Sequence, residues 1–397
     1  MNRDDFLMLN NDYIYFDNGA TTFKPNSVVN KVVDYYTKYT ANSHRGDYDL
    51  SQKVDYLYEE TRDKVKDFIN ASSSKEIIFT SGTTMSLNMI VFGFMKYYLQ
   101  KGDEVLITKA EHASNVLPWL ELEKEIGIVV KYIPLKDLKV DLETVKNCIT
   151  EKTKVISLAY ITNVIGDIRP IKEIAKLIHE NNGLIVVDGA QSVPHIKTNV
   201  IEDDIDFLAF SAHKMLGPTG TGVLYGKYIY LDKMKPIFYG GGMNSRFEST
   251  KEIEYKTLPL RLEAGTQNIA GVLGLSASID YLNSIGINKI HEHELELKNY
   301  LLEKLKSIDN ITVYNKNTDS GIVVFNIDNI FSEDTSRYLN HYHIFVRAGN
   351  HCTKMVKDEL GIKNTCRISF YLYNTKEEID KLIEVLKNNK DLYEIIL

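Results

Sequence analysis

From about residue 76 onward, short apolar runs alternate with longer stretches in which apolar residues recur at helical spacing. Short runs rich in β-branched residues are typical of buried strands, and the helical spacing is typical of amphipathic helices. This alternation predicts an α/β domain whose mostly parallel sheet is covered by helices on both faces. The predicted strands are 77–79, 105–108, 129–133, 155–160, 184–187 and 207–210, and the predicted helices include 85–100, 117–126 and 171–181.

The pattern changes after Gly265, where long helical stretches precede short, scattered strands. We therefore expect a large domain over residues 15–265 and a smaller α+β domain formed by residues 1–14 and 266–397. No Pro/Gly/Ser-rich linker divides them, so the two domains should pack closely, with the ligand site in the cleft between them. In the smaller domain the predicted helices are 269–284, 289–307, 333–341 and one from Thr375, and the predicted strands are 311–314, 321–326, 344–347 and 367–369.

Composition and charge narrow the class of protein. The chain has 397 residues, 44% of them hydrophobic and 25% charged, which is ordinary for a folded globular protein. Its 47 Lys and Arg against 54 Asp and Glu give a net charge of −7, which disfavours a nucleic-acid or anionic-membrane surface. The chain starts with acidic residues and has no apolar run of membrane-spanning length. We expect a cytoplasmic protein that binds neither nucleic acid nor membranes.

The cysteines do not form a structural framework. Cys148, Cys352 and Cys366 are too few and too scattered for disulfide staples, and no CxxC pair is present. Cys148 and Cys366 are expected to pack in the core. The segment His291-Glu-His-Glu294 lacks the spacing of a helical zinc site, so we expect no metal centre.

Polar residues follow five successive predicted strands, and the ends of parallel strands meet at one edge of a sheet. Each group alone has a plain structural alternative as a helix cap, a turn or a surface lysine. Together they offer an anion cradle, an imidazole, an amide, a carboxylate and a lysine, which are the groups that a phosphorylated pyridine aldehyde requires. The segments are Thr80-Ser-Gly-Thr-Thr84, Glu111-His112, Thr162-Asn163, Asp188-Gly-Ala-Gln191 and Ser211-Ala-His-Lys214.

This ordered set resembles the class V aminotransferase family, and most closely its SUF-type (group II) cysteine desulfurases and selenocysteine lyases. The resemblance spans nearly the whole chain, through segments 15–22, 43–46, 263–267 and 346–352 to Arg367. It implies the PLP-dependent transferase fold of type I, with pyridoxal 5'-phosphate as cofactor.

The resemblance also assigns roles to individual residues. Lys214 would bind the cofactor aldehyde covalently, His112 would stack on the ring, and Asp188 would pair with the ring nitrogen. Asn163 and Gln191 would meet the ring oxygen. The implied phosphate ligands are Thr83, Thr84, Ser211 and His213, joined by Thr266 from the partner subunit of a homodimer, and the implied substrate contacts are Arg367, Arg347, His44 and Asn163.

Cys352 separates the reactions that this fold can host. A lone cysteine is usually a small buried hydrophobe or an idle surface thiol. In the enzymes that this chain resembles, however, the attacking thiol lies in this loop, and a later arginine, here Arg367, clamps the substrate carboxylate. The loop is short, which matches the SUF-type group, and Asn350 stands where that group usually has a second histidine.

We therefore predict a PLP-dependent cysteine desulfurase, a sulfurtransferase that converts L-cysteine to L-alanine and holds the sulfur as a persulfide on Cys352. The sulfur would go to an acceptor protein of iron–sulfur cluster assembly. One alternative is a selenocysteine lyase or another class V lyase or epimerase. An alternative of a different class is an inactive scaffold of this fold in a sulfur-transfer complex.

Overall fold

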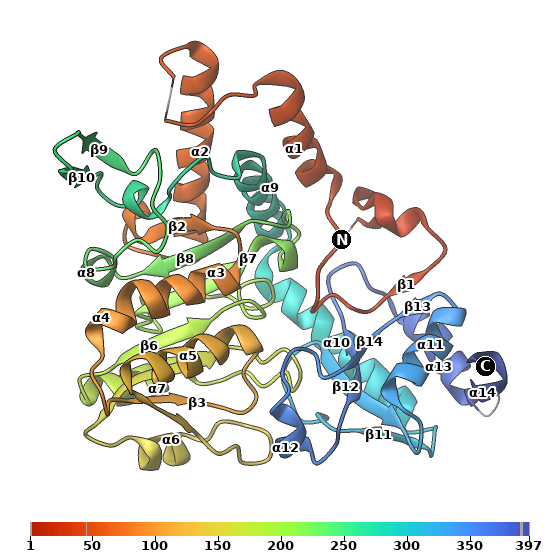
Figure 1. Cartoon of the computed structure of the whole chain (residues 1–397). Helices are drawn as coiled ribbons and strands as arrows, with labels where there is room; N and C mark the ends of the chain where they lie inside the picture. The colour runs from red at the N-terminus through yellow and green to blue at the C-terminus, as the bar shows by residue number, and fades with distance from the viewer. Residues whose placement is uncertain (1, 45, 390–391, 397) are drawn as a thin grey trace.

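A computed structural model describes residues 2–44, 46–389 and 392–396. Its centre is a seven-stranded sheet with the order β2-β8-β7-β6-β5-β3-β4 (Figure 1). Neighbouring strands are parallel except at β8, which is antiparallel to both β2 and β7. The strands are β2 (Ile77–Thr80), β3 (Glu104–Ile107), β4 (Val129–Tyr132), β5 (Thr153–Ala159), β6 (Leu184–Asp188), β7 (Phe207–Ser211) and β8 (Gly222–Gly226).

Side chains of these strands enter two apolar clusters alternately, one on each face of the sheet. On β7, Leu208 and Phe210 belong to one cluster, while Phe207 and Ala209 belong to the other. Burial of both faces explains why the strands read as continuous apolar runs. The helices of this part are α1 (Asn26–Lys38), α2 (Asp49–Phe68), α3 (Thr83–Asn88), a π-helical segment (Met89–Met95), α4 (Lys96–Tyr98), α5 (Leu117–Ile126), α6 (Leu142–Cys148), α7 (Ile171–Glu180), α8 (Tyr228–Leu231) and α9 (Ile269–Ile285).

Strand β8 was not predicted, because Gly217, Gly220 and Gly222, which precede or begin it, are typical of a turn. Gly222 has no room for a side chain, since a Cβ there would lie 2.4 Å from the Gly82 Cα and 2.7 Å from the Phe210 carbonyl oxygen. This close approach brings the turn that begins α3 against the end of β7.

The smaller sheet is antiparallel, with the order β11-β12-β15-β14. Its strands are β11 (Ile311–Val313), β12 (Ile322–Ile327), β14 (Arg347–Gly349) and β15 (Thr365–Ser369), and β1 (Ile14–Tyr15) pairs in parallel with β13 (Ile344–Phe345). A hairpin of β9 (Asn244–Phe247) and β10 (Ile253–Tyr255) projects at the upper left of Figure 1. The helices here are α10 (Ile287–Leu305), α11 (Ser332–His341), α12 (Val356–Leu360), α13 (Lys376–Lys387) and α14 (Leu392–Ile396), and short 3-10 turns occupy Arg3–Asp5, Leu7–Asn10, Ser74–Glu76, Ala113–Asn115, Ala212–Lys214 and Leu260–Leu262.

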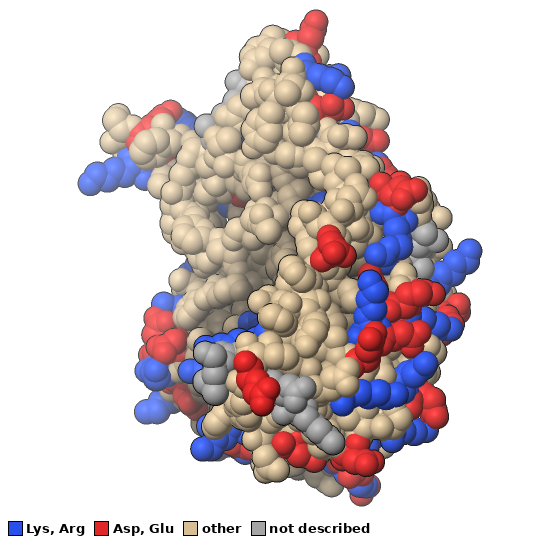
Figure 2. All heavy atoms as spheres, turned by 90° about the vertical axis from the view of Figure 1, so that its right-hand side faces the viewer, with Lys and Arg blue, Asp and Glu red and all other residues tan. Residues whose placement is uncertain are grey.

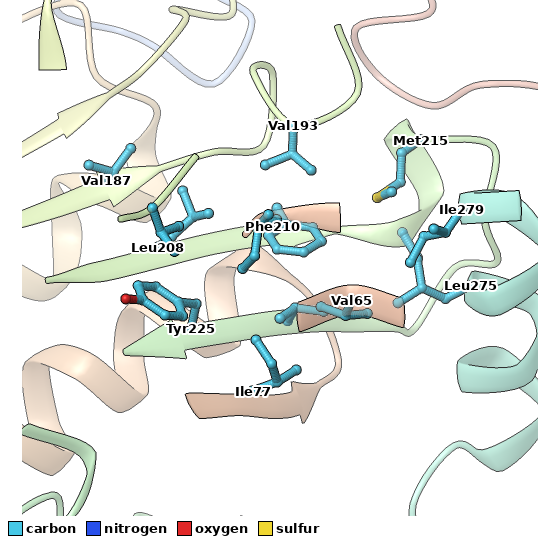
Figure 3. Packing of buried hydrophobic residues seen from close by; sticks show 14 of the residues in the cluster. Val65, Ile77, Val187, Val193, Leu208, Phe210, Met215, Tyr225, Leu275 and Ile279 are labelled. Carbon is cyan, nitrogen blue, oxygen red and sulfur yellow. The ribbon is translucent and has the colours of Figure 1, made fainter. Parts of the chain in front are cut away.

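The predicted α/β architecture is confirmed, whereas the predicted domain boundary after residue 265 stays a prediction. Helix α9, which lies just beyond that boundary, packs against α1 and α2. Figure 3 shows Leu275 and Ile279 of α9 in one cluster with Val65 of α2 and Phe210 of β7. The core of the large sheet therefore includes residues beyond 265.

The surface carries charges of both signs. On the face in Figure 2, acidic and basic side chains interleave in the lower and right-hand parts, and mostly uncharged side chains surround a hollow in the upper half. Across the described part of the chain, no helix is long and apolar enough to cross a membrane.

Candidate active site

A cavity of about 220 Å³ lies where the strands of the large sheet end, beside the smaller sheet. The structure gathers there most of the side chains that the sequence singled out. They are Thr83, Thr84, His112, Asn163, Asp188, Gln191, Ser211, His213, Lys214, Arg347 and Arg367.

Lys214 ends the 3-10 turn that follows β7. The turn is fixed by the His213 carbonyl oxygen, which accepts hydrogen bonds from the Thr22 N–H (3.0 Å) and the Lys24 Nζ (3.1 Å). Burial lowers the pKa of Lys214 to about 8, with Asp188 opposing the shift and Arg367 adding to it. A useful fraction of the amine is therefore neutral and nucleophilic near neutral pH.

This shift predicts the pH dependence of cofactor attachment. In the cofactor-free protein, the rate at which pyridoxal phosphate bonds to Lys214 should rise with pH and level off above a midpoint near 8, because only the neutral amine attacks an aldehyde. Stopped-flow absorbance measures this rate. Arg367→Leu should move the midpoint to higher pH, because it removes a cation that lowers the Lys214 pKa. A wild-type midpoint near the ordinary lysine value of 10.5 would contradict the prediction.

Asp188 is the last residue of β6 and is buried. Burial raises the pKa of its carboxyl to about 6, although the Ala190 N–H donates to Oδ1 at 2.9 Å. Without a cationic partner in the cavity this carboxylate is costly, and a protonated ring nitrogen would be such a partner. Three residues after Asp188, the Gln191 side chain donates from Nε2 to the Gly19 carbonyl oxygen at 2.8 Å.

His112 follows the strand β3. Its Nδ1 accepts the Ser114 N–H at 3.1 Å, which leaves Nε2 as the protonated nitrogen of the neutral ring. Burial, reinforced by Lys214 and Arg347, lowers the pKa of His112 to about 4. The imidazole is therefore neutral at physiological pH and suited to stacking on a flat ring rather than to pairing with an anion.

A buried carboxylate holds the loop that carries His112. Glu111 accepts the Asn115 side-chain amide at 2.9 Å and the Ala159 N–H at 2.7 Å, and it pairs with the fully buried Arg169. The loop is thereby fastened to the end of β5.

The anion cradle is formed by hydroxyls and backbone at the start of α3. The Thr83 N–H donates to the Ser211 Oγ at 2.8 Å, and the two hydroxyls of these residues lie 2.7 Å apart. Thr84 Oγ1 lies 2.7 Å from the Ser114 Oγ. Hydroxyls and backbone N–H groups at the start of a helix are the donors that commonly bind a phosphate.

Arg367 of β15 is fully buried and held on two sides. Its Nη2 pairs with the Asp17 Oδ1 at 2.7 Å, and its Nη1 donates to the Asn163 carbonyl oxygen at 2.9 Å. Gly19 lies against the guanidinium, since a Cβ there would be 3.1 Å from Cζ. Within the described residues the buried Nε has no hydrogen-bond partner, and Arg367 is one of the two arginines that line the cavity.

Cys352 is exposed and lies beside the cavity. Its carbonyl accepts the N–H of Ala113, the neighbour of His112, at 2.8 Å, and the Arg347 Nη2 lies 3.5 Å from its Sγ. Both His351 and Cys352 have left-handed backbones, with φ of 52° and 60°.

The side chain of Asn163 contacts the loop that carries Cys352. Its side-chain amide donates to the His351 carbonyl at 2.8 Å and accepts the Thr353 hydroxyl at 2.9 Å, so it holds the loop on both sides of Cys352. Its assignment to the ring oxygen stays a prediction.

Two predicted site residues, His44 and Thr266, lie outside the cavity. Their segments lie close together instead: Asn42 donates to the Thr266 hydroxyl at 3.3 Å, and His44 lines a second cavity with Gly265 and Gln267. Arg45, which directly follows His44 in the sequence, is outside the described residues.

Sequence reasoning missed Asp17, Gly19 and Ser114 as site residues. Asp17 and Gly19 lie inside the segment 15–22 and Ser114 follows Glu111-His112, so the resemblance of these motifs was the only feature of the sequence that could have identified them. Asp17 contacts a residue 350 positions away, a pairing that local patterns do not reveal.

Comparisons with known proteins identify the family of the chain. The model of the aminotransferase class V family matches residues 14–382. A probable cysteine desulfurase of Halalkalibacterium halodurans is 44% identical over 381 residues, covering 96% of this chain and 94% of that protein. The apo structure of a cysteine desulfurase from Thermococcus onnurineus NA1 has a TM-score of 0.93 at 36% identity and covers 97% of this chain and 96% of its own. The cysteine desulfurase CsdA of Escherichia coli has a TM-score of 0.92 at 34% identity, covering 100% of this chain and 98% of its own. The predicted family is confirmed: the chain belongs to the aminotransferase class V family.

Proposed function

We propose that this protein is a cysteine desulfurase, which converts L-cysteine to L-alanine and takes the sulfur onto Cys352 as a persulfide. The observation that carries the proposal is the placement of an exposed thiol, next to Arg347, beside a cavity that holds a buried lysine and a buried carboxylate. The named relatives support the same reaction. Membership in the SUF-type subgroup remains part of the proposal.

Pyridoxal phosphate is the cofactor, and the donors of the cavity fit it. Thr83, Thr84, Ser211 and His213 would hold the phosphate, His112 would cover the ring, and the buried Asp188 would keep a proton on the ring nitrogen. When bound, the cofactor withdraws electrons from the substrate Cα. Lys214, with its lowered pKa, would accept the proton that leaves this carbon.

The substrate carboxylate would bind Arg367, which lines the cavity, and this contact would orient the amino acid with its sulfur toward Cys352. The Cys352 thiolate then attacks the substrate sulfur. A sulfur–sulfur bond forms, the carbon–sulfur bond breaks, and its electron pair stays on the substrate carbon. Protonation of that carbon, and return of a proton from Lys214 to Cα, give alanine and leave the persulfide on Cys352.

The test combines product analysis with mapping of the cofactor lysine. Pure protein loaded with pyridoxal phosphate should form alanine and sulfide in equal amounts from L-cysteine with a thiol reductant present. Borohydride reduction and peptide mass mapping should place the cofactor on Lys214. Selenocysteine turnover without cysteine turnover would instead support a selenocysteine lyase, and no turnover with bound cofactor would support an inactive scaffold.

We also propose that the protein is a homodimer in which Thr266 completes the phosphate site of the second copy. Thr266 and His44 lie outside this chain's own cavity, and exposed apolar side chains occur on the nearby elements, among them Val33 and Tyr36 of α1 and Phe247 of β9. A Lys214→Ala chain mixed with a Thr266→Ala chain should give one intact site in each heterodimer. Heterodimers with no more activity than either parent would contradict the sharing.

The destination of the sulfur is part of the same proposal. We propose that the persulfide on the short Cys352 loop is transferred to a sulfur-accepting protein. That protein would belong to an iron–sulfur cluster assembly system. The cytoplasmic location expected from the sequence is likewise proposed.

A further inference from the structure

A buried ion pair lies outside the catalytic cavity, between Arg62 of α2 and Glu263. The two side chains are 1% and 2% exposed. Arg62 Nη1 and Nη2 donate to the two carboxylate oxygens at 2.7 and 3.0 Å, a bidentate geometry that fixes both groups. Tyr58 lies beside the pair, with its hydroxyl 3.3 Å from the same carboxylate.

The pair is fastened to the last strand of the large sheet. Among the described strands, β8 is the only neighbour of β2 in that sheet. The Phe79 N–H donates to the Glu263 carboxylate at 2.7 Å, and the Ile77 carbonyl accepts from Arg62 Nη1 at 2.8 Å. The ion pair thus satisfies backbone groups that an adjacent strand would otherwise satisfy.

The ion pair also contacts the segments that carry Thr266 and His44, the two predicted site residues that lie outside this chain's own cavity. Glu263 directly precedes Ala264-Gly265-Thr266, and Gly265 has a positive φ of 83°. On the other side, Arg62 Nε donates to Glu59 at 2.9 Å, and the other oxygen of Glu59 lies 3.2 Å from His44 Nε2. Thr266 is exposed, and its segment is held by three contacts: the bond from Asn42, the Gly265 N–H that donates to the Gly241 carbonyl at 2.8 Å, and the buried carboxylate of Glu263.

We propose that Glu263, held by Arg62, is a positioning residue that fixes segment 264–267 so that Thr266 reaches the cofactor phosphate of a second copy. This inference rests on the proposed homodimer. Glu263 touches neither substrate nor cofactor. Its loss would free the exposed segment more than β2, because β2 keeps its backbone pairing with β8. The effect should therefore appear in the partner's site and not in the site of the chain that carries the change.

Heterodimers with a single Lys214 distinguish an effect on the partner's site from an effect on the site of the chain that carries the change. In the first, a chain with both Lys214→Ala and Glu263→Gln is paired with a wild-type chain, so the changed segment serves the one remaining lysine site. In the second, a Lys214→Ala chain is paired with a Glu263→Gln chain, so that site receives an unchanged segment. The reference pairs a Lys214→Ala chain with wild type. The readout is the rate at which the Lys214-bound cofactor loses its visible absorbance when a trap removes free pyridoxal phosphate.

The first heterodimer should lose cofactor roughly ten- to hundredfold faster than the reference, the effect of losing a hydrogen bond to a charged phosphate. The second should match the reference. Arg62→Lys, which keeps the charge but loses the bidentate geometry, should repeat the pattern if Glu263→Gln folds poorly. Equal acceleration in both heterodimers, or none in either, would overturn the inference and leave a purely structural ion pair.

Thr266→Ala in place of Glu263→Gln tests the underlying dimer separately. If Thr266→Ala accelerates release only when it lies on the partner chain, the sharing of sites stands whatever Glu263 does. If Thr266→Ala acts within its own chain, or the protein is monomeric, the proposed dimer fails and the inference fails with it.

Discussion

Replacing Cys352 with serine is expected to abolish the formation of alanine and sulfide from L-cysteine while leaving the cofactor bound. A serine hydroxyl is not ionised near neutral pH and does not accept sulfur as a persulfide. The expected loss of kcat is more than about a thousandfold, as for removal of other essential nucleophiles. Cofactor absorbance and its shift on adding L-cysteine should persist, because Cys352 is not among the residues lining the cavity.

Cys148→Ser is the matched control, since it makes the same chemical change at a half-buried cysteine of α6. It should retain wild-type turnover. Selenocysteine should still react with the Cys352→Ser protein, because selenium leaves more readily than sulfur. If Cys352→Ser desulfurates L-cysteine as fast as wild type, the persulfide step is wrong and the protein is another lyase of this fold.

Replacing Arg367 with lysine is expected to lower kcat/KM for L-cysteine by roughly a hundredfold, mostly through KM. Lysine keeps the charge but loses the planar fork of Arg367, a residue that lines the cavity and that we assign to the substrate carboxylate. Loss of one partner of a buried charge pair costs about 2–5 kcal/mol of binding, which brackets this change. Steady-state kinetics with L-cysteine measures it.

The control for Arg367→Lys is the cofactor-loaded protein without substrate. Its absorbance and its thermal unfolding should stay close to wild type, provided that the lysine still pairs with Asp17. A fall in kcat/KM matched by an equal fall in cofactor content would show that Arg367 supports the structure and does not bind substrate.

Most of the cavity could be predicted because parallel strands end at the same edge. Asp188 at the end of β6 and Lys214 just after β7 are local features of an α/β pattern, and the topology brings them together. The resemblance then supplied the roles. Arg367 and Cys352 were found only through it, since they come from the other sheet and no local period connects them to β6.

What could not be predicted depends on contacts between distant segments. Helices α1 and α2 precede the alternating pattern, and β8 is hidden by its terminal glycines. The motifs also do not reveal that His44 and Thr266 lie outside the cavity. Their positions depend on contacts with other residues: His44 contacts Glu59, and Glu263 precedes the segment of Thr266.

The outer edge of β2 has a consequence for the solubility of the chain. An uncovered strand edge is a template on which other chains can add strands and aggregate. Arg62 and Glu263 occupy the Ile77 carbonyl and the Phe79 N–H with side chains, which cannot extend a sheet. Once Glu263 has packed against β2, the same two residues therefore protect this edge against intermolecular β-pairing, before any second copy has been met.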